Sequence, residues 1–219
     1  MPLILDREID SQTRLGLWKI DEGSGELKKQ AKLDAVEEDQ YNSFKSEIRK
    51  KQWLSYHILL KKMLSPCPVA LEYDDYGKPH LKNNGPCLSI SHSGDYSAVI
   101  TSKGHPVGID IECLKERIYR ISHKFLCTEE DQNIGETNRL EKLYIVWGAK
   151  EALYKIYGRP EIEFQRDISV DSFDYLCGGK GRCTASMKTP EGLEKFSIFY
   201  EKISGYMLVY ALKMKIAEK

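Results

Sequence analysis

The chain has 219 residues and 41% hydrophobic amino acids, which is enough for one large domain or two small ones with a buried core. Lys plus Arg (33) balance Asp plus Glu (33), so no net charge steers the protein toward nucleic acid or an anionic membrane, and we expect neither partner. Charged residues interrupt the first twenty positions, and no later run reaches the ~18 apolar residues of a membrane span. We therefore expect a cytoplasmic protein without a signal peptide.

The first half of the chain predicts one helix followed by short strands. Apolar residues recur at helical spacing within residues 34–64, and Ser65-Pro66 ends the pattern. Strand-like runs follow at 69–73, 88–91 and 96–102, separated by turn residues. These elements predict a small antiparallel sheet packed on the helix.

The second half predicts a similar cycle after Gly-His-Pro at 104–106. A strand at 107–112 precedes a short helix capped by Thr128, with Asp131 as the residue three positions on. A longer helix at 139–157 stops at Gly158, and strands at 196–203 and 206–214 form a hairpin. We expect an α+β fold of two α+β halves, residues 1–105 and 106–219.

Two acids stand together on the strand at 107–112. Successive side chains of a strand point to opposite faces, so apolar residues at 107, 109 and 111 place Asp110 and Glu112 side by side on the other face, roughly 7 Å apart. That spacing allows both carboxylates to reach one divalent cation. A half-exposed edge strand with solvated acids would give the same alternation.

The helix at 139–157 supplies a third acid. Glu151 and Lys155 lie on adjacent turns of one face, and Lys150 points about 100° away, toward a different part of a large anion. Glu151 before Lys155 is also a common helix-stabilising pair worth only about 0.3 to 0.5 kcal/mol. Trp147, on the same helix, is expected to support packing.

A polar cluster ends the strand near residue 91. Ser91 and His92 lie in Ser-Ile-Ser-His-Ser-Gly at 89–94, where hydroxyls, an imidazole and free backbone amides suit a phosphate. The usual nucleotide-binding loops are absent, so a bound anion must be held by dispersed basic residues and a metal. Hard oxygen ligands favour magnesium. Basic residues around Arg49 fit this scheme, and they equally fit a solvated helix face.

Four segments of the chain together resemble the surfactin-synthetase-activating type of 4'-phosphopantetheinyl transferase. They are Tyr-Gly-Lys-Pro at 76–79, Ser-Ile-Ser-His-Ser-Gly at 89–94, Val-Gly-Ile-Asp-Ile-Glu at 107–112 and Trp-Gly-Ala-Lys-Glu-Ala-Leu-Tyr-Lys at 147–155. Each is weak alone, but their order and spacing are specific. The resemblance covers residues 34–158 well and the C-terminal strands loosely.

The resemblance implies two similar α+β halves related by a pseudo-twofold, with coenzyme A in the cleft between them. It implies magnesium on the coenzyme A pyrophosphate, held by Asp110, Glu112 and Glu151. The implied contacts to coenzyme A are Arg49, Lys78, Pro79, Ser91, His92, Asp110 and Lys155, and we add Lys150 from its direction on the helix.

The implied reaction is that of a holo-[acyl-carrier-protein] synthase. A serine of an apo acyl or peptidyl carrier protein attacks the β-phosphate of coenzyme A and releases adenosine 3',5'-bisphosphate, with Glu151 as general base and Lys155 neutralising charge. We expect a monomer. Two alternatives remain: a metal-dependent phosphohydrolase using the same acids, and a coenzyme A- or carrier-binding module without activity.

Overall fold

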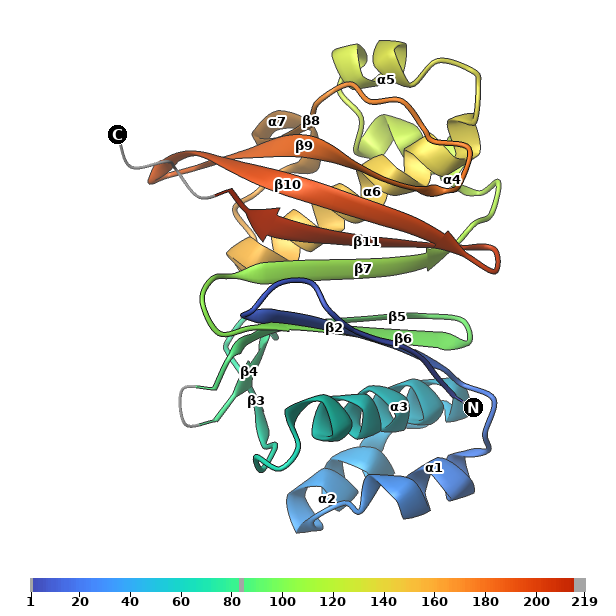
Figure 1. Ribbon diagram of the computed structural model, residues 1–219, viewed down its shortest axis with the longest axis vertical. Coiled ribbons are helices and arrows are strands. Elements are labelled where there is room, and N and C mark those ends of the chain that lie inside the picture. The colour runs from blue at the N-terminus through green and yellow to red at the C-terminus, as the bar shows by residue number, and fades with distance from the viewer. Residues whose placement is uncertain (1, 83–84, 215–219) are drawn as a thin grey trace. The chain divides into compact units, whose positions relative to one another are not determined.

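A computed structural model describes residues 2–82 and 85–214, which form two compact units (Figure 1). Unit 1 consists of Met1–Glu72 and Pro79–Gly104, and unit 2 consists of Tyr73–Lys78 and His105–Lys219. Each unit contains helices and an antiparallel sheet, which confirms the α+β class. The chain thus changes unit three times, because the short segment Tyr73–Lys78 belongs to unit 2 although unit 1 flanks it on both sides.

Unit 1 is built on a four-stranded antiparallel sheet of order β1-β2-β6-β5. Its strands are β1 (Leu3–Glu8), β2 (Thr13–Lys19), β5 (Cys87–Ser93) and β6 (Tyr96–Ser102). Its helices are α1 (Ser24–Ala31), α2 (Ala35–Ser43) and α3 (Glu47–Leu64), and α3 packs against β2 and β6. Two short strands, β3 (Leu71–Tyr73) and β4 (Pro79–Leu81), pair separately.

The single helix predicted at 34–64 is wrong, because the chain forms two helices there. Asp34 caps α2, accepting from the amide of Glu37 at 2.8 Å, and α2 ends where Phe44 is extended. Ser46 then starts α3, and its hydroxyl accepts from the amide of Arg49 at 3.4 Å. A side-chain oxygen at each start satisfies helix amides that have no partner within the helix.

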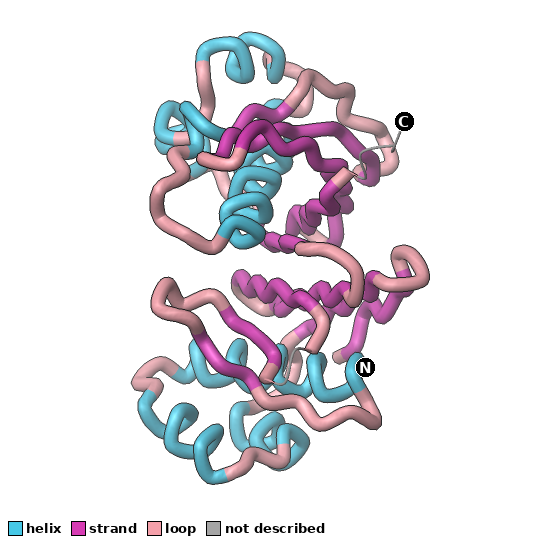
Figure 2. Tube along the Cα trace, turned by 90° about the vertical axis from the view of Figure 1, so that its left-hand side faces the viewer, coloured by secondary structure: helices cyan, strands magenta, loops and turns pink. Residues whose placement is uncertain are grey.

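Unit 2 contains a five-stranded antiparallel sheet of order β7-β11-β10-β9-β8. Its strands are β7 (Val107–Cys113), β8 (Ile168–Val170), β9 (Lys180–Thr189), β10 (Gly192–Ile203) and β11 (Tyr206–Lys213). Its helices are α4 (Ile118–Ile121), the 3-10 turn η1 (Ser122–Lys124), α5 (Thr128–Ile134), α6 (Arg139–Tyr157) and α7 (Phe164–Asp167). The long helix α6 lies along one face of this sheet, over β7 and β11 (Figures 1 and 2).

The ends of the unit 2 elements follow the sequence closely. Helix α6 has the predicted bounds and ends at Gly158, whose φ of 74° only glycine adopts without strain. The predicted hairpin forms between β10 and β11 through Ser204 and Gly205. The cap predicted for α5 is off by one residue: Cys127 is the N-cap, and its amide donates to Glu130 Oε2 at 2.9 Å.

No helix within residues 2–82 and 85–214 combines the length and the apolar character that a membrane span requires.

Candidate active site

Strand β7 directs Asp110 and Glu112 toward helix α6. In the register with β11, Asp110 lies opposite Val209 and Glu112 opposite Met207, and both partners belong to the apolar core that α6 covers. Asp110 is only 5% exposed, whereas Glu112 is partly exposed. A solvated acid at position 110 is therefore excluded, although β7 does lie at one edge of the unit 2 sheet.

Two glycines let α6 approach the sheet at this point. A Cβ at Gly108 would lie 2.0 Å from the carbonyl oxygen of Ala152, and a Cβ at Gly148 would lie 2.7 Å from a methyl carbon of Val209. Neither position can carry a side chain without moving the helix. The close approach brings the Glu151 turn of α6 next to the acids of β7.

The three acids form one electrostatic cluster. Burial, together with the negative charges of Asp110 and Glu112, raises the pKa of Glu151 to about 7, and the positive charge of Lys155 opposes this shift. Gly148, one turn earlier on α6, also lies beside the strand, because a Cβ there would be 3.7 Å from Asp110 Oδ2. The Glu151 turn of α6 thus lies in the same region of unit 2 as the two strand acids, and their common metal site stays a prediction.

Lys155 lies at the same place and contacts Asp110 directly. Its ammonium donates to Asp110 Oδ1 at 2.8 Å and to the carbonyl oxygen of Ile109 at 2.9 Å. One turn of α6 therefore offers a base, Glu151, and a cation, Lys155, to the same small region. This arrangement can neutralise an anion while a neighbouring carboxylate accepts a proton.

Arg117 is a second cation at the Glu112 end of the cluster, and the sequence patterns above do not point to it. Its Nη2 lies 4.0 Å from Glu112 Oε2. The loop that carries it is tied to α6, because the Tyr144 hydroxyl accepts from the amide of Lys115 and donates to its carbonyl, both at 3.1 Å. Only its position shortly after the acidic strand could have indicated this arginine.

The chemistry of the donor set suits magnesium. All three side chains offer carboxylate oxygens, and Mg²⁺ binds through one or two carboxylates while keeping water and substrate phosphate as its other ligands. Among the described residues, no group of three or more His, Cys, Asp or Glu side chains is already arranged around one point as a metal cage.

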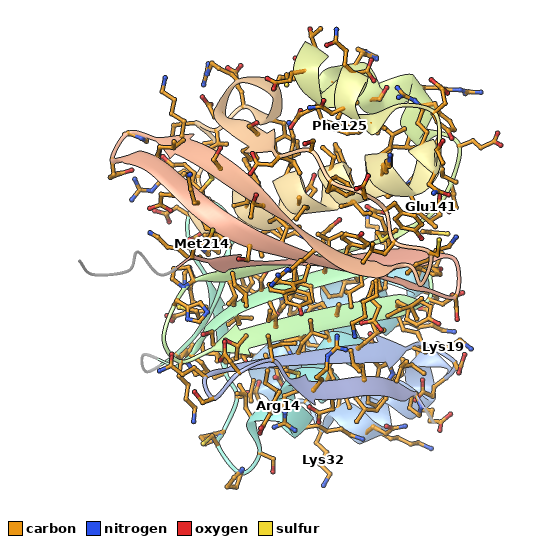
Figure 3. All side chains as sticks on the ribbon, turned by 45° about the horizontal axis from the view of Figure 1, so that its top comes forward. Arg14, Lys19, Lys32, Phe125, Glu141 and Met214 are labelled. Atoms are coloured by element: carbon orange, nitrogen blue, oxygen red, sulfur yellow. The ribbon has the colours of Figure 1, made fainter. Side chains whose placement is uncertain are left out.

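Lys150 lies in the core of unit 2. The predicted contact between Lys150 and coenzyme A does not agree with this position. Lys150 has no exposed surface, and its ammonium lies 2.7 Å from Glu130 Oε2. It also donates to the carbonyl oxygens of Phe125, Phe164 and Ile168 at 2.7 to 2.9 Å (Phe125 is labelled in Figure 3). A lysine with these partners ties α6 to the surrounding segments and cannot reach a ligand at the surface.

In unit 1, Arg49 and His92 lie together. The guanidinium of Arg49 contacts His92 Nε2, and the Tyr56 ring is parallel to the imidazole with centroids 6.3 Å apart. His92 therefore faces α3. Its neighbour Ser91 is 7% exposed and points to the opposite face of β5, so the two side chains do not share one surface of the strand.

The remaining predicted residues, Lys78 and Pro79, are adjacent in sequence. Pro79 begins β4 and is partly buried. Lys78 belongs to unit 2, where its ammonium donates to the carbonyl oxygen of Ile156 at 2.6 Å, at the C-terminal end of α6.

Comparison with known proteins shows which family this part of the chain is similar to. Residues 106–205 match the 4'-phosphopantetheinyl transferase superfamily, and this range contains Asp110, Glu112, Glu151 and Lys155. Similar proteins include the 4'-phosphopantetheinyl transferases AcpT of Escherichia coli (strain K12), 32% identical over 130 residues, and of Salmonella typhimurium, 31% identical over 131 residues.

These two alignments cover 57% of this chain and span 65% and 66% of the relatives. A 4'-phosphopantetheinyl transferase of Bacillus subtilis is 27% identical over 139 residues, which are 60% of this chain and 57% of that protein. Residues 106–205, which are just under half of the chain, are thus similar to the 4'-phosphopantetheinyl transferase superfamily.

Proposed function

We propose that this protein transfers the 4'-phosphopantetheine group of coenzyme A to a serine of an apo carrier protein. The observation that carries the proposal is the cluster of Asp110, Glu112 and Glu151 with Lys155, inside the part of the chain that matches the superfamily. Three relatives named 4'-phosphopantetheinyl transferase support the same reaction.

In the proposed mechanism, the serine hydroxyl oxygen forms a bond to the β-phosphorus of coenzyme A. The bond from that phosphorus to the bridging pyrophosphate oxygen breaks, and adenosine 3',5'-bisphosphate leaves with the electron pair. Glu151 accepts the serine proton, directly or through a water, because its carboxylate lies beside the proposed metal site and the leaving phosphate. Lys155 stabilises the negative charge on the leaving phosphate.

Magnesium is the proposed cofactor, held by Asp110, Glu112 and Glu151. When bound, it would polarise the pyrophosphate and neutralise charge on the departing oxygen. Asp110 also accepts from Lys155, so the acid that would bind the metal also orients the cation beside it.

Coenzyme A needs further contacts beyond the acidic cluster. We propose Arg49, Ser91 and His92 of unit 1 as contacts to its phosphates and Pro79 as a contact to its adenosine end. The Arg49–His92 contact supports this assignment, because it holds a guanidinium, which can bind phosphate, beside the imidazole.

The full proposal is a cytoplasmic, monomeric holo-[acyl-carrier-protein] synthase. Its substrates are coenzyme A and an apo acyl or peptidyl carrier protein, and it has neither a nucleic acid nor a membrane as partner. The balanced charge of the chain agrees with the last point.

The test is intact-mass spectrometry of several apo carrier proteins after incubation with this protein, coenzyme A and magnesium. The proposal predicts a gain of one phosphopantetheine mass on at least one carrier, and no gain when magnesium is chelated. Coenzyme A cleavage without any carrier would indicate a metal-dependent phosphohydrolase instead. Tight binding of coenzyme A without transfer at any magnesium concentration would indicate a binding module.

A further inference from the structure

The segment Tyr73–Lys78 is a turn built around the Asp74 carboxylate. Asp74 Oδ1 accepts from the amide of Tyr76 at 3.0 Å and from the amide of Lys78 at 2.9 Å. Backbone bonds close the turn, with Gly77 donating to Asp74 at 2.9 Å and Asp74 donating to Lys78 at 3.1 Å. The turn is therefore defined locally, and it presents the Lys78 side chain from a fixed position.

Lys78 reaches the last turn of α6. Its ammonium donates to the carbonyl oxygen of Ile156 at 2.6 Å. Its aliphatic stem covers Gly158, where a Cβ would lie 2.6 Å from Lys78 Cδ. The final carbonyls of a helix have no partner within the helix and carry its negative partial charge, so a lysine at this place stabilises the helix end.

This helix end is next to the candidate active site. Ile156 directly follows Lys155, whose ammonium is fixed to Asp110 and Ile109 of β7. Glu151 lies one turn earlier on α6. The last turn is thus fastened at two adjacent residues, to β7 through Lys155 and to the Asp74 turn through the Ile156 carbonyl.

We propose that Lys78 is a positioning residue that holds the C-terminal turn of α6, so that Lys155 and Glu151 stay in place for transfer. This inference rests on the proposed function. In this role the Lys78 ammonium binds a carbonyl oxygen of the protein itself, that of Ile156. The sequence resemblance instead predicts that Lys78 lies beside the adenine and the 3'-phosphate of coenzyme A. The two roles predict different responses to removal of that phosphate.

The experiment compares Lys78→Met with wild type. Methionine keeps the stem that covers Gly158 and removes the ammonium. Lys78→Arg tests rescue by another cation, and Lys82→Met removes an exposed lysine close by in the chain as the matched control. Two quantities are measured for each protein: hydrogen exchange of the amides at 154–158, and kcat and KM for coenzyme A and for 3'-dephospho-coenzyme A at a temperature where every variant is folded.

We expect Lys78→Met to speed exchange at 154–158 by about two- to fivefold, because a partly exposed helix-end cation contributes modestly. We expect kcat to fall about tenfold with both substrates, since a small displacement of reacting groups is costly. The preference for coenzyme A over its 3'-dephospho form should stay within about twofold of wild type. Lys78→Arg should recover most of kcat, and Lys82→Met should match wild type.

A phosphate-contact role would show the opposite pattern and overturn the inference. Lys78→Met would then lose the preference for the 3'-phosphate, raise KM for coenzyme A alone and leave exchange at 154–158 unchanged. Unchanged kcat with faster exchange would also overturn it, because Lys78 would then stabilise the helix without serving transfer. Failure of the proposed function would look different: wild type itself would transfer nothing to any carrier.

Discussion

Lys155 Nζ lies 2.8 Å from Asp110 Oδ1, so the cation of the candidate site and the most deeply buried of its acids are already paired before any substrate binds. The lysine is 27% exposed and the aspartate 7% at their side chains, which leaves the pair partly shielded from water. Water screens such a partly shielded ion pair less than a fully solvated surface pair, so the attraction between the two charges is stronger.

Lys155→Met should lower the rate of phosphopantetheine transfer by about a hundredfold or more, because it removes charge stabilisation from the leaving phosphate. The measurement is the initial transfer rate at saturating coenzyme A. Lys202→Met is the matched control, since Lys202 also pairs with a carboxylate, Glu141, at 2.9 Å but lies outside the cluster. Comparable rates for the two variants would remove Lys155 from the mechanism.

Lys150→Met should destabilise the fold by about 3 to 5 kcal/mol, because it leaves Glu130 buried without its cation. Changing both partners, Lys150→Met with Glu130→Gln, should recover part of this loss. Urea denaturation measures the free energy of unfolding of each variant. The exposed pair of Lys213 and Glu194 serves as the comparison, and Lys213→Met should cost at most about 1 kcal/mol.

Gly108→Ala should separate α6 from β7. Its Cβ would meet the backbone oxygen of Ala152 at 2.0 Å, and backbone cannot rotate away as a side chain can. We expect a loss of about 1 to 3 kcal/mol in stability together with reduced transfer. Gly25→Ala in α1 meets nothing within 4 Å and should leave activity unchanged with a slightly higher melting temperature. Equal melting temperatures for Gly108→Ala and wild type would show that the strand and helix can move apart freely.

Stability should fall in acid partly through Glu37. Burial would raise the pKa of this carboxyl, but the nearby His57 ring, 3.3 Å away, and hydrogen bonds from Lys61 and the Asp34 amide outweigh burial and hold its pKa at about 2. The folded pKa is below the ordinary value of 4.5, so the contribution is present above pH 4.5 and lost as pH falls toward 2. Urea denaturation of wild type and Glu37→Gln should therefore differ most above pH 4.5 and converge near pH 2. A difference that does not change with pH would contradict this linkage.

The central elements of the site could be predicted from the sequence because each depends on local pattern. Strand alternation alone predicts that Asp110 and Glu112 share one face of β7. The 3.6-residue helical period predicts that Glu151 and Lys155 share one face of α6. Gly158 marked the end of α6, where a positive φ is required.

Other features depend on residues far apart in the chain, which local pattern does not reveal. Helical geometry gave the direction of Lys150 but not Glu130 and the carbonyls that surround it. The Lys78 contact with Ile156 joins residues 78 positions apart. The break between α2 and α3 was missed because apolar spacing continues through it, while the cap at Ser46 decides the boundary.

The most direct test of the account is the transfer rate of Asp110→Asn, Glu112→Gln and Glu151→Gln across a magnesium titration, with Asp131→Asn as the control. Asp131 is an exposed acid of α5 that pairs with Arg139. We expect each cluster variant to lose about a hundredfold or more in rate, while the control keeps wild-type activity and magnesium dependence. Near wild-type rates in all three variants, with transfer intact in the control, would contradict the assignment of these carboxylates as the active site.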